Sequence, residues 1–150
     1  MFATGMVDDV LIANAYATDE ELHACAAVNP SILTFGIELE KELTDTEKQI
    51  LDYEPKHVVR GDMSEYMIRS TWPRVIFADQ SIPAGNTRDL RPGDVVILND
   101  GYLKYKGELH IVTKDMPNDG RKNVIGHLPE YEHVLLDYIE PWKVFAFRIV

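Results

Sequence analysis

The spacing of hydrophobic residues changes near residue 30 and divides the chain into two parts. Residues 10–14 (VLIAN) form a short continuous apolar run, which predicts a strand buried on both faces. Residues 18–21 have the spacing of a capping box and predict a helix that carries Leu22 and Cys25 on its apolar side and ends before Pro30. The first part therefore consists of one predicted βα unit, and such parallel units are not stable alone.

After Pro30 the hydrophobic positions alternate with polar or small ones, beginning with the four apolar residues between Leu33 and Leu39. This period of two predicts a strand. A second capping box at residues 44–47 predicts a short helix that ends at Pro55. Turn sequences rich in Gly, Pro, Asn and Asp separate the further predicted strands, at residues 57–60, 64–71, 74–78, 94–98, 102–113, 122–128, 133–139 and 143–149. Short strands at this spacing are typical of a β-barrel or β-sandwich. We expect a mainly β protein, with a closed or nearly closed antiparallel barrel.

Composition narrows the class of protein without changing this fold. Apolar residues make up 45% of the 150 residues and charged residues 27%, as in a globular protein. The formal net charge of −10 argues against a nucleic-acid partner, because binding to phosphate backbones requires clustered Lys and Arg. No apolar run approaches 18 residues, so we expect no membrane span. Asp8 and Asp9 interrupt the apolar N-terminus, which argues against a signal peptide, and we expect a cytoplasmic protein.

The residue types that usually bind metals or act as nucleophiles are sparse and scattered. Cys25 is the single cysteine, which excludes an intrachain disulfide, and we expect it to be a small core residue. The five histidines lack the local spacing of metal ligands, so we predict no metal site. Asn14 and Tyr16 follow the first predicted strand at its carboxyl end, where ligands bind in parallel βα units. They are candidate substrate-binding residues, although a simple loop explains them equally well.

A more specific candidate lies in the predicted strand at residues 64–71 and the residues after it. Alternation places Arg69 on the opposite face from Ser70, and Arg74 follows shortly after. Guanidinium groups flanked by hydroxyls match phosphate or carboxylate, so Arg69, Ser70 and Arg74 are candidate anion ligands. Salt bridges on an acidic surface are the alternative.

The long predicted strand at residues 102–113 has Gly107 near its centre. A glycine inside a strand marks a bulge, a barrel bend or a close approach, and we favour the bend. Lys106 and Glu108 flank Gly107 on one face, either paired with each other or facing a polar cleft. Tyr105 precedes them, and these three residues complete the candidate ligand-binding set.

Several of these segments together resemble one known family. The runs DDVLIANAYATDEEL, RGDMSEYMIRSTWPR, GYLKYKGELHIVTKDMPNDGRKNVIG and LLDYIEPW occur in an order similar to the C-terminal part of bacterial 6-phospho-N-acetylmuramidases, many of which are called outer surface proteins. The resemblance implies a (β/α)₈ barrel followed by a cyclophilin-like β-barrel. On that basis, residues 1–29 match the last βα unit of the first barrel, and residues 31–150 match the second domain.

The resemblance also implies a function. Members of the family hydrolyse the bond between 6-phosphorylated N-acetylmuramic acid and N-acetylglucosamine during peptidoglycan turnover and cell-wall recycling, without a cofactor. Glycoside hydrolysis needs two carboxyl groups on barrel strands that this sequence lacks, so we assign no catalytic residue to it. The implied partner is a phosphorylated amino sugar, bound near Asn14, Tyr16, Arg69, Arg74 and residues 105–108. A non-catalytic sugar-phosphate or protein-binding module is the alternative, and a second copy of the chain is a further candidate partner.

Overall fold

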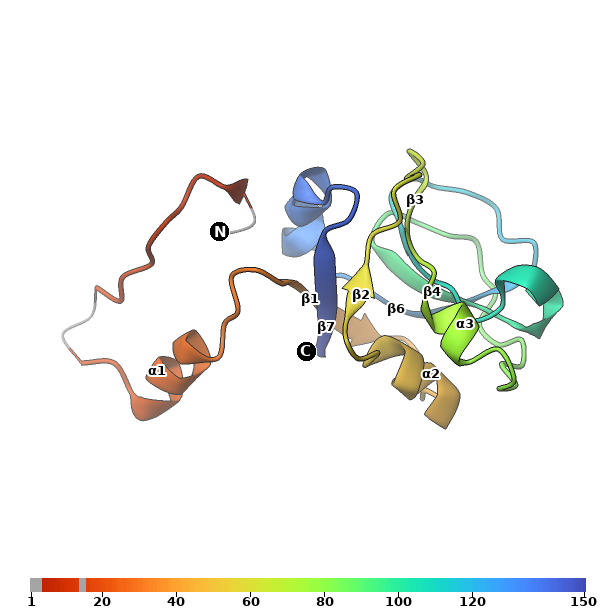
Figure 1. Ribbon diagram of the computed structural model, residues 1–150, viewed down its shortest axis with the longest axis horizontal. Helices are drawn as coiled ribbons and strands as arrows, with labels where there is room; N and C mark the ends of the chain where they lie inside the picture. The colour runs from red at the N-terminus through yellow and green to blue at the C-terminus, as the bar shows by residue number, and fades with distance from the viewer. Residues whose placement is uncertain (1–3, 14–15) are drawn as a thin grey trace.

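The computed structural model describes residues 4–13 and 16–150. It has two parts: an extended N-terminal segment that carries helix α1 (Asp19–Ala26), and a β-barrel that begins at residue 33 (Figure 1). The N-terminal segment reaches away from the barrel, while the C-terminal strand lies beside the first barrel strand in the sheet. The change in hydrophobic spacing near residue 30 therefore coincides with a change in architecture.

Seven strands form one sheet in the order β2-β7-β1-β6-β4-β5-β3. The strands are β1 (Leu33–Leu39), β2 (His57–Val58), β3 (Met67–Ser70), β4 (Asp94–Leu98), β5 (Leu109–Val112), β6 (Lys122–His127) and β7 (Val144–Ile149). The two edges nearly meet, because the Arg60 amide, just after β2, donates to the Arg69 carbonyl on β3 at 2.9 Å. The predicted barrel is confirmed as a nearly closed one. It is not wholly antiparallel, however, since β1 and β7 run parallel.

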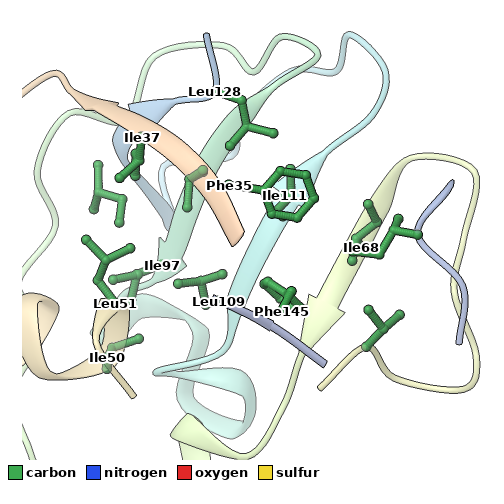
Figure 2. Close-up of a cluster of buried hydrophobic side chains, with 14 of the residues drawn as sticks. Phe35, Ile37, Ile50, Leu51, Ile68, Ile97, Leu109, Ile111, Leu128 and Phe145 are labelled. Atoms are coloured by element: carbon green, nitrogen blue, oxygen red, sulfur yellow. The ribbon is translucent and has the colours of Figure 1, made fainter. Parts of the chain in front are cut away.

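The inward-facing side chains of the strands form the hydrophobic core (Figure 2). Phe35 on β1 and Phe145 on β7 are fully buried and pack edge to face, with ring centroids 6.2 Å apart. Helix α2 (Asp45–Leu51) begins at the predicted capping box, and its Ile50 and Leu51 side chains pack into the same cluster. Burial of large aliphatic and aromatic side chains such as these is the main source of stability in a domain of this kind.

Two segments that we predicted as strands are helical. Residues 74–78 belong largely to α3 (Pro73–Ile76), where Pro73 occupies the first turn and its fixed φ favours a helix. Residues 133–139 fall mostly in the 3₁₀ helix η3 (Glu130–Tyr138), which starts after Pro129. In η3 the consecutive residues Leu135 and Leu136 both pack against the core, which is a helical pattern rather than an alternating one.

The predicted strand at residues 102–113 is also wrong in its first half. The 3₁₀ helix η2 (Asp100–Tyr105) starts where the Asn99 side chain accepts a hydrogen bond from the Gly101 amide. The chain then turns at Gly107, whose φ is +85°, and only β5 is extended. A Cβ at Gly107 would lie 3.2 Å from the Arg74 Cα, so this glycine permits both a turn and a close approach, rather than the expected barrel bend.

The described residues of the predicted N-terminal strand are not extended in a sheet. Val10, Leu11 and Ile12 are exposed, Leu11 to 88%, because no neighbouring strand covers them. The second element is confirmed, since α1 has the predicted capping box at Thr18. Cys25 is exposed, which corrects its assignment to a core, because α1 buries none of its own residues. Within residues 4–13 and 16–150, no helix has the length and apolarity needed to cross a membrane.

Candidate functional site

A pocket of about 340 Å³ lies on the outer face of the barrel, over the adjacent strands β3, β5, β4 and β6. Leu109 and Ile111 of β5 point into the core, so alternation turns Glu108 and His110 outward. Helix η2 and the loops before β3 and β6 surround the opening. The lining residues are Asp62, Ser64, Met67, Arg69, Leu98, Tyr102, Tyr105, Glu108, His110, Met116 and Lys122.

Glu108 organises one wall of this pocket. Its side chain is 0% exposed, yet both carboxylate oxygens have partners. Oε2 accepts hydrogen bonds from Arg69 Nε at 3.1 Å and Arg69 Nη2 at 2.8 Å, and Oε1 accepts from Arg74 Nη1 at 2.8 Å. His110 Nε2 lies 2.9 Å from Oε2. One buried carboxylate therefore fixes two guanidinium groups and one imidazole.

The protonation states of Glu108 and His110 follow from this geometry. Burial raises the pKa of Glu108, but the hydrogen bonds from His110 and Arg69 outweigh it, so the pKa is lowered overall. Burial lowers the pKa of His110 despite its bond to Glu108. The pair is therefore a carboxylate and a neutral imidazole, in which Nε2–H donates. His110 Nδ1 is buried without a hydrogen-bond partner among the described residues, so a second proton there would lack an acceptor.

Tyr105 covers the two arginines that Glu108 holds. The Arg69 and Arg74 guanidinium carbons lie 5.7 and 5.4 Å from its ring centroid, within the range of cation–π contacts. Tyr102 packs edge to face against Tyr105 with centroids 5.5 Å apart. Both rings come from η2, so the unpredicted helical turn supplies the aromatic side of the pocket.

Lys122 lies at the start of β6, across the strands from Arg69. Its side chain is only 8% exposed. The nearest carboxylate oxygen, Asp119 Oδ1, is 3.6 Å from Nζ, and the Tyr102 ring centroid is 5.5 Å away. The pocket therefore has a cation on each side, with the Glu108 carboxylate between them.

Three of the predicted ligand-binding residues line the pocket: Arg69, Tyr105 and Glu108. Arg74 joins them indirectly through Glu108 but does not line the pocket. The two interpretations left open for Arg69 and Arg74 are therefore both supported, since these arginines form salt bridges with a buried carboxylate and Arg69 also borders a pocket.

The other predicted residues lie elsewhere. Ser70 faces the core and lies 2.9 Å from His57 Nδ1, because alternation turns it away from Arg69. Lys106 Nζ lies 3.5 Å from Asp100 Oδ1 rather than beside Glu108. The turn at Gly107 lies between Lys106 and Glu108 and ends the alternation on which their common face was predicted. Tyr16 is 93% exposed on the N-terminal segment and does not line the pocket. Asn14 lies outside the described residues.

The lining residues that were absent from the sequence-based set include Tyr102, His110 and Lys122. The strand register brings two of them together, because His110 pairs with Arg69 on one side and with Val96 on the other, and Leu98 pairs with Lys122. Polar residues at alternate positions of apolar strands were the available signal. Their common face becomes visible only once the pairing is known. Among residues 4–13 and 16–150, no three His, Cys, Asp or Glu side chains are grouped to hold a metal ion.

Comparison with known proteins places this barrel in a family. A family model described as 6-phospho-N-acetylmuramidase, C-terminal, matches residues 33–148, which span β1 to nearly the end of β7. The chain belongs to this muramidase C-terminal family. A search of curated proteins gave no match.

Two solved structures are similar to this muramidase C-terminal domain. An uncharacterized protein from B. cereus shares 43% identity over 98% of the chain, with a TM-score of 0.89. A conserved Enterococcus faecalis protein of unknown function shares 24% identity over 77% of the chain, with a TM-score of 0.63, and supports the fold alone. The chain spans 42% of the first protein and 30% of the second.

Proposed function

We propose that this chain is the substrate-binding C-terminal domain of a 6-phospho-N-acetylmuramidase that acts in cytoplasmic cell-wall recycling. In this proposal it binds the phosphorylated amino sugar and leaves hydrolysis to carboxyl groups elsewhere in the enzyme. The family match supports the enzyme class. The observation that carries the binding role is the pocket wall in which Glu108 holds Arg69 and Arg74 beneath Tyr105.

The charge of the pocket favours an anionic ligand. The lining cations Arg69 and Lys122 are balanced by the lining carboxylates of Glu108 and Asp62. Arg74 and Arg60 pair with these two acids and add positive charge beside the pocket, whereas the whole chain carries a formal net charge of −10. Asp62, the other acid that lines the pocket, is paired with Arg60 at 2.5 Å. A local excess of positive charge on an acidic protein attracts a phosphate group and orients the molecule that carries it.

The size and lining of the pocket suit the sugar to which the phosphate is attached. A volume of about 340 Å³ lies within the usual range of small-molecule sites. The Tyr102 and Tyr105 side chains line the pocket beside polar groups, a combination that suits the mixed apolar and hydroxylated faces of a pyranose ring. The pocket therefore favours a sugar phosphate over a free phosphate ion.

The same geometry argues against Glu108 as a catalytic acid. A glycosidase acid needs a raised pKa so that it can donate a proton at neutral pH. The pKa of Glu108 is lowered instead, and both of its oxygens are held by arginines. Glu108 is consequently a positioning residue for Arg69 and Arg74.

Steady-state kinetics of the full-length enzyme that carries this domain test the proposal. Replacing Arg69 with alanine should raise KM for the phosphorylated disaccharide by roughly tenfold while changing kcat little, because only substrate binding is lost. Arg148→Ala, on β7 outside this pocket, is the matched control and should leave both constants unchanged. An Arg69→Ala enzyme that folds and has unaltered KM would refute the binding role.

A further inference from the structure

Lys122 is a largely buried cation that has an ion-pair partner but no hydrogen-bond acceptor among the described residues. Its side chain is 8% exposed and it lines the pocket. No described residue accepts a hydrogen bond from Nζ, since the nearest carboxylate oxygen is at 3.6 Å. A lysine ammonium carries three N–H donors, and those of Lys122 are available to a ligand in the pocket.

Asp119, the acid nearest to Lys122, accepts hydrogen bonds from Arg121. Asp119 Oδ2 accepts hydrogen bonds from Arg121 Nε at 2.9 Å and Arg121 Nη2 at 2.5 Å. The hydrogen bonds from Arg121 lower the pKa of Asp119 to about 2, and the charge of Lys122 contributes in the same direction. Arg121 also lies over the Tyr102 ring, 4.2 Å from its centroid, on the same side of the site as Lys122. Asp119 is therefore shared between an ion pair with Lys122 at 3.6 Å and hydrogen bonds from Arg121.

Arg69, the second cation that lines the pocket, already has a hydrogen-bonded carboxylate partner. Arg69 gives two N–H groups to the buried Glu108 carboxylate, which neutralises much of its charge. Three strand spacings separate β3 from β6, so the Arg69 and Lys122 backbones are roughly 14 Å apart, enough for a sugar between their side chains. Of the two, Lys122 has the greater unused capacity to bind an anion.

We infer that Lys122 is the primary anchor for the phosphomonoester group of the ligand, and that the Arg69–Glu108–Arg74 cluster forms the opposite wall, against the sugar. This inference rests on the proposed function and deepens it by naming the residue that binds the phosphate. The ammonium supplies a compact charge with three donors, and a phosphomonoester supplies three acceptor oxygens and close to two negative charges at neutral pH. Binding completes the hydrogen bonds that Nζ lacks in the free chain.

Calorimetric titration of the 150-residue chain with N-acetylglucosamine 6-phosphate tests this inference, because that probe has a phosphate but no carboxylate. The wild-type chain should bind it and should bind unphosphorylated N-acetylglucosamine much more weakly. In the Lys122→Met chain the Kd for the sugar phosphate should rise about tenfold or more, as expected for a lost charge-assisted hydrogen bond. Lys48→Met removes the same charge from an exposed lysine of α2 and should change the Kd less than about twofold.

Thermal unfolding separates the binding role of Lys122 from a structural one. Methionine fills similar volume without a charge, so Lys122→Met should keep or raise Tm. A marked fall in Tm would show that the ammonium serves the fold and would overturn the inference. An unchanged Kd in that variant would also overturn it while leaving the proposed function intact. Failure of the wild-type chain to bind the sugar phosphate would overturn both.

Discussion

Strand β5, together with Glu108 just before it, has two buried faces whose surroundings differ. Leu109 and Ile111 point inward and are fully buried among apolar side chains (Figure 2). Glu108 and His110 point outward and are almost as thoroughly buried, but among charged and aromatic groups. Neighbouring residues of this segment are thus similarly buried, but one set is apolar and the other is polar or charged.

The difference shows how burial relates to function in this domain. Apolar burial lowers the free energy of the folded state, whereas burial of charges costs free energy that their hydrogen bonds only partly return. The inner face therefore explains why the barrel folds. The outer face is partly apolar as well, since Val96, Val112 and Val124 form a second buried cluster with Leu90. The buried charged groups around Glu108 have no equivalent explanation in stability, which makes them the part of the barrel to interpret as a binding site.

The largest effect is expected on the inner face. Ile111→Ala should lower the free energy of unfolding by about 3 to 4 kcal/mol, because it leaves a cavity in a closely packed core. Urea denaturation followed by circular dichroism measures the change. Val134→Ala is a matched control at an exposed position and should cost less than about 1 kcal/mol. Equal losses at the two sites would mean that Ile111 does not occupy a packed core.

A smaller loss is expected on the outer face. Glu108→Gln keeps the shape of the side chain but removes the charge that two arginines and His110 share, and should cost about 3 kcal/mol. The same urea experiment measures it. Glu65→Gln breaks an exposed ion pair with Lys114 and should cost less than about 1 kcal/mol. A Glu108→Gln chain as stable as the wild type would contradict the organising role of this carboxylate.

The inner face also contains a histidine that makes stability depend on pH. Burial lowers the pKa of His57 from 6.5 to about 4, and Ser70 and the Leu51 carbonyl lie within hydrogen-bonding distance of its ring nitrogens. Below pH 6.5 the unfolded chain binds a proton that the folded chain does not. Stability from this group is therefore complete above pH 6.5 and is lost as the pH falls towards 4.

Between pH 7 and pH 5, His57 should account for a loss of about 2 kcal/mol. His110 acts in the same direction, because burial lowers its pKa as well. Urea titrations at both pH values should show a smaller pH-dependent loss in a His57→Gln chain than in the wild type. Identical pH dependence in the two chains would rule out a buried neutral His57 as the cause.

The smallest effect is expected where neither face of the barrel is involved. Leu11 lies in the N-terminal segment and is 88% exposed. Leu11→Ser should change the free energy of unfolding by no more than about 0.5 kcal/mol in this chain. Chemical denaturation is again the measurement, and a loss above about 1 kcal/mol would show that the segment packs on the barrel.

The sequence predicted the elements whose signals are local. The alternation from Leu33 to Leu39 and the capping boxes at Thr18 and Thr44 were sufficient to locate β1, α1 and α2. η3 was mistaken for a strand, because short apolar runs have no distinctive period and contacts with the core decide their conformation. The exposure of Cys25 was missed for a related reason, since burial depends on a packing partner that helical spacing cannot reveal.

The candidate site was predicted in part. Arg69, Arg74 and Glu108 were selected for their chemistry, but their common contact joins positions 34 to 39 residues apart. Lys122 was not predicted, because a single lysine at the start of a strand gives no signal of a binding site in the sequence. Only the strand register places it in the pocket that Arg69 and Glu108 line. Ser70 was also selected, although its alternation with Arg69 already placed it on the opposite face, where it contacts His57 in the core.

Amide NMR titration of this chain with N-acetylmuramic acid 6-phosphate tests the binding role of the outer face most directly. The account predicts saturable shifts concentrated at residues 62–69, 102–110 and 119–122, around the pocket lining. Unphosphorylated N-acetylmuramic acid should cause much smaller shifts at the same concentration. The absence of shifts with the phosphorylated sugar at millimolar concentration, or shifts confined to residues away from these segments, would contradict the account.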